Sequence, residues 1–287
     1  MRRFNIVMLL DAAGEHVLMC RRQKPPYQGL LNLVGGKLEA GEEPLHAAYR
    51  ELREETGATI ADVQLHHLVT FVYPGGCAGF DASELQAYVG RLRHEMEVVE
   101  EANPLCWVSL DANFFDMDRF SGEGNIGHIL ETARRYSAAW LQPSKMEISL
   151  VPAKGEDHER IAHAWQCQNG EPVTLHLDGY GNDYLLMVNE CMAGYAVLKE
   201  ETTESGLQLQ AAFDILKPFR RCGVGGQVLA MLERIAAREE CSLRLRFAVD
   251  DAAAHAFCCK YGYMDLVQEG CWMVYVRGGK AGGAHEA

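Results

Sequence analysis

The sequence lacks several features that would restrict its class. No run of 18 apolar residues occurs, which argues against a membrane-spanning helix, and the apolar stretch that begins near the N-terminus ends at Asp11, too early for a secretory signal. Ten cysteines are present, but none forms a Cys-x-x-Cys pair or a Cys/His zinc spacing. We therefore expect a cytoplasmic protein with reduced, mostly buried thiols and no membrane partner.

Positive charge is also in deficit. The chain has 27 Lys and Arg against 40 Asp and Glu, a formal net charge of −13. A nucleic-acid polymer is bound by clustered Lys and Arg, so we expect no such partner, although one basic pocket for a small anion is compatible with this balance. The length of 287 residues accommodates two cores of about 140 residues each.

Strand and helix signals alternate along the first half of the chain. The clearest is a helix over 44–56, where Leu45, Ala48, Tyr49 and Leu52 recur at helical spacing between Pro44, which suits a first turn, and Gly57, which suits the position after the end. The other signals predict strands at 5–10, 16–20, 65–73, 85–92 and 105–109 and a helix at 126–136.

Periodicity is lost over 137–145 and then resumes. The signals beyond this break predict strands at 147–151, 184–188, 194–199, 207–216, 243–249 and 271–276, and helices at 160–168, 226–238 and 252–261. We therefore predict an α/β (α+β) fold with two domains, residues 1–140 and 146–277. The glycine-rich residues 278–287 are expected to form a disordered tail.

Three carboxylates are concentrated on the helix predicted at 44–56. Glu51, Glu54 and Glu55 are spaced i, i+3 and i+4, so they project from one face and repel one another unless a cation lies between them. Mg²⁺ (or Mn²⁺) prefers such oxygen ligands together with substrate phosphates. By itself, this spacing is as typical of a solvated acidic helix face.

The surrounding sequence favours the metal. Residues 36–58 resemble the Nudix box, G-x5-E-x7-R-E-U-x-E-E-x-G-U, at every fixed position from Gly36 to Gly57, whereas Ala58 is smaller than the usual aliphatic residue. The resemblance implies an α/β/α sandwich with a mixed sheet. It further implies that Glu51, Glu54 and Glu55 bind metal with the backbone carbonyl of Gly35, and that Arg50 orients one of these glutamates.

Three further positions resemble the MutT-like branch of that family, which hydrolyses oxidised nucleoside triphosphates such as 8-oxo-dGTP to the monophosphate and pyrophosphate. Arg22 stands where that branch binds phosphate, Glu101 begins an E-x-x-P-x-x-W segment whose glutamate approaches the metals, and Asn125 stands where the branch reads the base. The alternatives are a surface charge, one more acid in an acidic loop, and a helix N-cap.

The substrate therefore has alternatives as well. Val34 replaces a common Pro, and Pro74 lies near a spacing associated with ADP-ribose hydrolases, although a turn explains it equally well. A hydrolase of ADP-ribose or of another nucleoside diphosphate derivative is the second reading. A Nudix module that senses nucleotide without hydrolysis and regulates the other domain is the third.

The second half contains a glycine-rich loop between a predicted strand and a predicted helix. Its residues are Arg220, Arg221, Cys222, Gly223, Val224, Gly225 and Gly226. Inward-facing amides and the positive end of the following helix suit a pyrophosphate, and a tight turn is the alternative.

This R-x-x-G-x-G loop and the elements around it resemble GNAT acetyltransferases over residues 146–277. The resemblance implies that residues 220–226 bind acetyl-CoA and that an amine, not identified by the sequence, accepts the acetyl group. The last motif departs from the family: Asp251 replaces an Asn, and Cys258 replaces the Tyr that protonates the departing thiolate. Cys258 is the candidate acid, with Tyr261 as a substitute and simple packing of Cys258 as the alternative.

Overall fold

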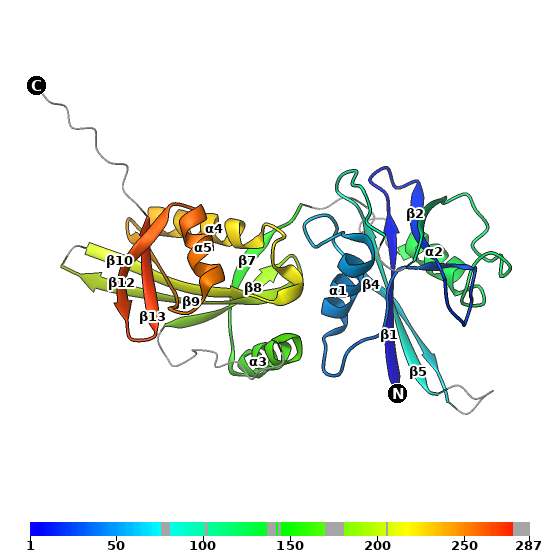
Figure 1. The fold of residues 1–287 in the computed structure, drawn as a ribbon, viewed down its shortest axis with the longest axis horizontal. Coiled ribbons are helices and arrows are strands. Elements are labelled where there is room, and N and C mark those ends of the chain that lie inside the picture. Colours follow the sequence, from blue (N-terminus) through cyan, green and yellow to red (C-terminus); the bar gives the residue numbers. More distant parts are fainter. Residues whose placement is uncertain are drawn as a thin grey trace, which may run out of the picture. The chain divides into compact units, whose positions relative to one another are not determined.

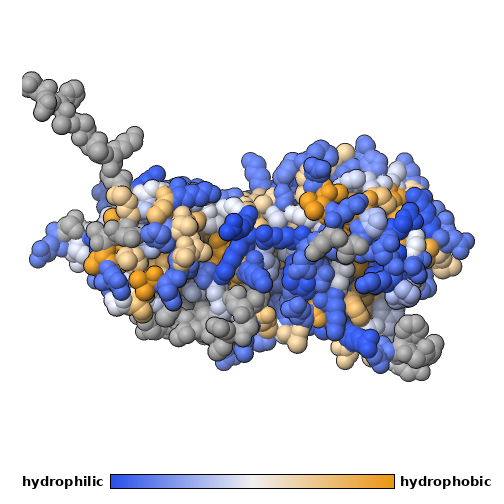
Figure 2. Space-filling view, viewed as in Figure 1, coloured by the Kyte–Doolittle hydropathy of each residue, from blue (hydrophilic) through white to orange (hydrophobic). Residues whose placement is uncertain are grey.

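The computed structural model describes residues 1–75, 81–100, 103–136, 142, 145–169, 181–204 and 206–277. The chain divides into two compact units. The first comprises Met1–Glu147 with His163–Glu171 and Lys217–Cys222, and the second comprises Ile148–Ala162, Pro172–Leu216 and Gly223–Ala287. Hydrophilic side chains predominate on the face of the molecule drawn in Figure 2.

A mixed sheet forms the centre of the first unit (Figure 1). Among the described residues its order is β3-β2-β1-β5-β4, and β6 also pairs with β2; β1 and β5 run parallel and the other pairs are antiparallel. The strands are β1 (Arg2–Leu10), β2 (His16–Arg21), β3 (Leu31–Leu33), β4 (His66–Tyr73), β5 (Ser83–Arg91) and β6 (Leu105–Ser109).

Helices α1 (Pro44–Thr56) and α2 (Asn125–Tyr136) lie on opposite sides of this sheet (Figure 1). Alternation along β1 explains why both faces are apolar: Ile6 and Met8 pack in the core that contains the apolar residues of α2, whereas Val7 and Leu9 point to the face that α1 covers. Each fully buried aliphatic side chain of this kind contributes about 1.5–3 kcal/mol.

The second unit is built on another mixed sheet. Over the described part of the chain its order is β12-β13-β11-β10-β9-β8-β7, and β10 with β11 is the parallel pair. The strands are β7 (Ile148–Pro152), β8 (Asn182–Val188), β9 (Cys191–Thr203), β10 (Gly206–Ile215), β11 (Ser242–Ala248), β12 (Tyr263–Glu269) and β13 (Trp272–Arg277). Its helices are α4 (Val224–Arg238), α5 (Ala252–Lys260) and the first part of α3 (Gly155–Asn169), whereas the short 3-10 helix η1 (Lys217–Phe219) belongs to the first unit. Helix α4 contacts β10 and β11, and α5 contacts β11 and β12.

The predicted fold class is confirmed, because both sheets are mixed and carry helices. Two strands were missed. Strand β3 has only three residues, which is too short for an alternating pattern, and β12 follows directly on the turn after α5, in a stretch for which no element was predicted. The predicted tail at 278–287 lies outside the described residues.

None of the nine described cysteines is in a disulfide. No helix in the described ranges is long and apolar enough to cross a membrane.

Candidate functional site

Helix α1 is defined at both ends by its sequence. Pro44 occupies the first turn, and Gly57 ends the helix in the left-handed conformation, φ 78°, with its N–H donating to the Arg53 carbonyl at 2.9 Å. Ala47, Ala48 and Leu52 are fully buried against the sheet. Beside this buried face lie the side chains of Arg50, Glu51 and Glu54, which are 20%, 16% and 52% exposed.

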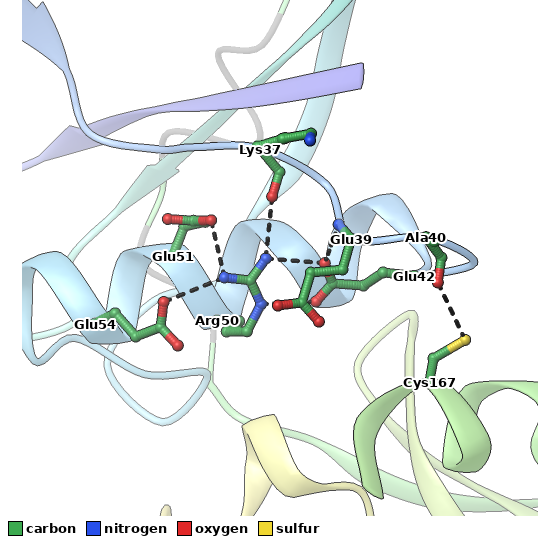
Figure 3. Close-up of polar contacts among 8 residues, drawn as sticks. All are labelled: Lys37, Glu39, Ala40, Glu42, Arg50, Glu51, Glu54 and Cys167. Carbon is green, nitrogen blue, oxygen red and sulfur yellow. Dashed lines mark hydrogen bonds and ion pairs between the residues drawn. The ribbon is translucent and has the colours of Figure 1, made fainter. Parts of the chain in front are cut away.

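Arg50 is the centre of a carboxylate network on this face (Figure 3). Its Nη1 donates to Glu51 Oε1 at 2.8 Å and to Glu54 Oε2 at 3.1 Å. Its Nε and Nη2 donate to the two oxygens of Glu42, both at 2.9 Å, and Nη2 also donates to the Lys37 carbonyl at 3.2 Å. The bonds that Arg50 donates to Glu42 and, after them, the bond to Glu51 raise the pKa of Arg50 above its usual range and hold it charged.

Glu42 is the member of this network whose role the sequence did not reveal. Its side chain is only 5% exposed, and it accepts the Glu39 amide at 3.1 Å besides the two bonds from Arg50. Glu42 precedes the helix, in the turn before α1, so no helical spacing connects it with Arg50. The signal that could have revealed its role is its position as the first fixed glutamate of the Nudix box.

The segment after β3 lies close to the same face of α1. Gly35 donates its N–H to Glu55 Oε2 at 2.7 Å, and a Cβ added at Gly36 would overlap the Glu51 carboxylate. Gly35 has φ 139°, and a side chain there would overlap the backbone of Asn5. Only a Gly-Gly pair allows the chain to pass between β1 and the carboxylates.

The donors of this cluster fit a hard divalent cation. Glu42, Glu51, Glu54 and Glu55 bring four negative charges against the one guanidinium of Arg50. Burial raises the pKa of the Glu51 carboxyl; Arg50 opposes this rise, and Glu54 and Glu42 add to it. Glu51 and Glu54 converge on one cationic nitrogen, a position that oxygen-binding Mg²⁺ also suits.

The carboxylates of Glu51, Glu54 and Glu55 do not converge on one common position in this structure. Within the described residues, no group of three or more His, Cys, Asp or Glu side chains is placed to hold an ion. The contacts explain this, because Arg50 bridges Glu51 and Glu54 while the Gly35 amide holds Glu55. Binding of a metal by all three glutamates would require Glu55 to turn away from Gly35.

The other predicted residues of this unit lie on separate elements. Arg22 follows β2, and its Nε is buried without a hydrogen-bond partner in the described structure. Asn125 is the first residue of α2, and its Nδ2 donates to the Tyr73 hydroxyl at 2.5 Å. Glu101 lies outside the described residues.

In the second unit the parallel strands β10 and β11 diverge. They are paired from Gln208 with Ser242 to Ala211 with Leu245, yet β10 continues to Ile215 and β11 to Ala248. Over these last residues β10 remains paired with β9, and β11 with β13. The carboxyl ends of diverging parallel strands are the usual position for a ligand in such sheets.

The predicted glycine-rich loop leads from this end of β10 into α4. Gly223 is the N-cap of α4 in the left-handed conformation, φ 81°, and Val224 begins the helix. Gly225 backs onto Phe257, and the Tyr261 hydroxyl lies where a side chain at Gly226 would be. Gly223, by contrast, has open space where a side chain would lie, so the N-cap of α4 is open to a ligand.

Arg220 and Arg221 precede these glycines in the loop. Arg221 has a left-handed backbone, φ 63°. The Arg220 guanidinium lies over the Trp165 ring, 5.5 Å from its centroid.

The residues of the last predicted motif, Asp251, Cys258 and Tyr261, have different structural surroundings. Asp251 caps α5 by accepting the Ala254 amide at 2.9 Å. Cys258 is fully buried, which favours its packing interpretation over that of a proton donor. Tyr261, by contrast, brings a hydroxyl to the first turn of α4.

A family model described as "NUDIX domain" matches residues 1–125. Two curated relatives are similar to parts of the chain: an octanoyltransferase from Myxococcus xanthus, 37% identical over 71 residues (25% of this chain), and an ADP-ribose pyrophosphatase from Bacillus subtilis (strain 168), 40% identical over 53 residues (18% of this chain). The chain spans only 20% and 29% of their respective lengths.

A solved structure of Arabidopsis thaliana Naa50, in complex with a bisubstrate analogue containing CoA, is also similar. Its sequence is 16% identical, and the match covers 45% of this chain and 96% of that one with a TM-score of 0.35.

Proposed function

We propose that this chain, whose residues 1–125 form a NUDIX domain, is a Mg²⁺-dependent hydrolase of phosphoric anhydrides in nucleoside diphosphate derivatives. The observation that carries this proposal is the network on α1, in which one guanidinium orients Glu51 and Glu54 beside Glu55 and the Gly-Gly pair. Three mutually repelling acids are costly for a module that only binds nucleotide, so their presence favours catalysis.

In this proposal Glu51, Glu54 and Glu55 hold the metal, with the Gly35 carbonyl as a further ligand. The bound metal would polarise a phosphoryl oxygen and lower the pKa of a water for in-line attack. Arg50 positions the carboxylates, and Glu42 fixes Arg50 through two hydrogen bonds. Arg22 and Glu101 are proposed to contact phosphate and metal.

Within this class we propose a nucleoside triphosphate, in particular an oxidised one such as 8-oxo-dGTP, which would give the monophosphate and pyrophosphate. ADP-ribose is the alternative substrate, and the similarity to an ADP-ribose pyrophosphatase supports it. A panel with 8-oxo-dGTP, ordinary triphosphates, ADP-ribose, NADH and coenzyme A, with monophosphate release as the readout, distinguishes them. Binding of a nucleotide with no turnover of any panel member would instead support the sensing module.

For the second unit we propose acetyl-CoA binding and transfer of the acetyl group to an amine. The divergence of β10 from β11 beside the glycine-rich start of α4 favours it. Gly223, Val224, Gly225 and Gly226 would present amides to the pyrophosphate, with Arg220 and Arg221 nearby in the sequence.

Tyr261 is the proposed donor of the proton to the departing thiolate, in preference to the buried Cys258. Calorimetric titration with acetyl-CoA tests the binding step. Release of free coenzyme A in the presence of an amine panel tests the transfer, and binding without release would limit this unit to a binding role.

A further inference from the structure

Asn5 is a polar residue on the face of the first sheet that α1 covers, in line with the apolar residues Val7 and Leu9 of β1. Its side chain is only 1% exposed, yet within the described residues neither its Nδ2 nor its Oδ1 has a hydrogen-bond partner. A buried amide without partners lowers stability, which an apolar side chain of the same shape would not do. The presence of Asn at this position therefore requires an explanation.

The strand register places Asn5 beside the carboxylate cluster of α1. The segment after β3 is antiparallel to β1, with Val7 bridged to Val34 and the Asn5 N–H donating to the Gly36 carbonyl at 2.9 Å. Asn5 therefore lies opposite Gly36, and residues directly opposite each other project from the same face. A side chain at Gly36 would meet the Glu51 carboxylate, so the side chain of Asn5 emerges next to that carboxylate.

The Glu51 carboxylate has an unused acceptor on this side. Arg50 donates to its Oε1 at 2.8 Å (Figure 3), whereas Oε2, which lies against Gly36, accepts no hydrogen bond from the described part of the chain. An ionised carboxylate only accepts hydrogen bonds, and the amide of Asn5 offers two donors. A buried donor and a buried acceptor thus lie side by side without being joined.

The neighbour of Asn5 on the other side does not use this amide. Gln86 of β5 is paired with Asn5 in the parallel register. Its Nε2 donates to Glu84 Oε1 at 2.6 Å, and its Oε1 accepts from the Tyr88 hydroxyl at 2.9 Å. Gln86 is therefore engaged along its own strand, and the Asn5 amide remains available to Glu51.

We propose that Asn5 is a positioning residue for metal binding by Glu51. When a cation takes the place of the Arg50 guanidinium between Glu51 and Glu54, the Asn5 amide donates to Glu51 Oε2 and keeps this carboxylate turned towards the cation. Hydrogen bonds of this kind orient metal ligands, and their loss lowers metal affinity by about 10- to 100-fold. The inference rests on the proposed role of Glu51 as a metal ligand and adds the residue that orients it.

Asn5→Leu separates this role from a merely structural one. Leu has the same number and branching of side-chain heavy atoms as Asn but neither donates nor accepts. Binding of Mn²⁺ to the full chain, without nucleotide, is followed by the electron paramagnetic resonance signal of the free ion. We expect the dissociation constant for Mn²⁺ to rise about 10-fold or more in Asn5→Leu. Hydrogen exchange of the β1 and α1 amides should not become faster, because the variant removes an unpaired buried amide.

Asn5→Thr tests the need for a donor at this position. Its hydroxyl restores one donor on a side chain that suits a strand, so it should bind Mn²⁺ more tightly than Asn5→Leu. Gln86→Met is the matched control, because it removes an amide from the same face of the sheet, one strand further from Glu51. Its affinity for Mn²⁺ should equal that of the wild type.

Three results would overturn the proposal: unchanged Mn²⁺ affinity in folded Asn5→Leu, an equal loss of affinity in Gln86→Met, or faster exchange in Asn5→Leu, which would show that Asn5 stabilises the fold. Failure of the proposed hydrolysis gives a different result, namely Mn²⁺ binding that depends on Asn5 without monophosphate release from any member of the nucleotide panel.

Discussion

Replacement of Glu42 by Gln should destabilise the first unit far more than replacement of Glu54 by Gln, although both carboxylates bind the same guanidinium. Glu42 is 5% exposed and makes two bonds to Arg50, whereas Glu54 is 52% exposed and makes one. Loss of a buried charge-assisted interaction costs about 2–3 kcal/mol, and loss of an exposed pair costs less than about 1 kcal/mol. We therefore expect Glu42→Gln to destabilise the first unit and Glu54→Gln to leave its stability nearly unchanged.

Hydrogen exchange of the α1 backbone amides in the full chain measures this difference locally. Each 1.4 kcal/mol is about a tenfold change, so Glu42→Gln should accelerate exchange from the globally protected amides by roughly 30- to 150-fold. Glu54→Gln should accelerate it by less than about fivefold. Equal acceleration in both variants would refute the assignment of Glu42 as the buried anchor of Arg50.

Three further predictions follow from individual contacts. Partial burial and the Glu123 carboxylate raise the pKa of Tyr27 to about 12, so the stability that this contact contributes is fully present below about pH 10 and is lost as pH rises through about 12. The phenolate absorbance difference between wild type and Tyr27→Phe should therefore have its midpoint near 12, and a midpoint near 10 would contradict the hydrogen bond from Tyr27 to Glu123. Gly36→Ala should displace the Glu51 carboxylate and reduce monophosphate release at least about tenfold, whereas Gly155→Ala, which meets no atom, should retain full activity. Gly226→Ala should displace the Tyr261 hydroxyl and lower coenzyme A release by the second unit, and unchanged release would exclude that contact from the transfer step.

The carboxylate face of α1 could be predicted from the sequence because its information is local. Pro44, Gly57 and the apolar spacing between them fixed the limits of the helix, and the spacing of the glutamates fixed the face they share. The predicted helix and the observed one have the same bounds, Pro44–Thr56.

Contacts made by loop residues could not be predicted in the same way. Glu42 precedes the helix and reaches Arg50 through a turn, and Tyr27 reaches Glu123 across 96 positions of the sequence. Such contacts depend on the paths of loops, which no periodicity encodes. Burial of Cys258 likewise follows from the packing of α5 and is not visible in its motif position.

The carboxylates of α1 are proposed to catalyse Mg²⁺-dependent hydrolysis of a nucleotide. The most direct test measures monophosphate release from the nucleotide panel by the wild-type chain and by Glu54→Gln, with hydrogen exchange showing that the variant is folded. We predict Mg²⁺-dependent release by the wild type and a loss of at least about 100-fold in the variant. Equal release by both proteins, or no release by a wild-type chain that binds Mg²⁺, would contradict the claim.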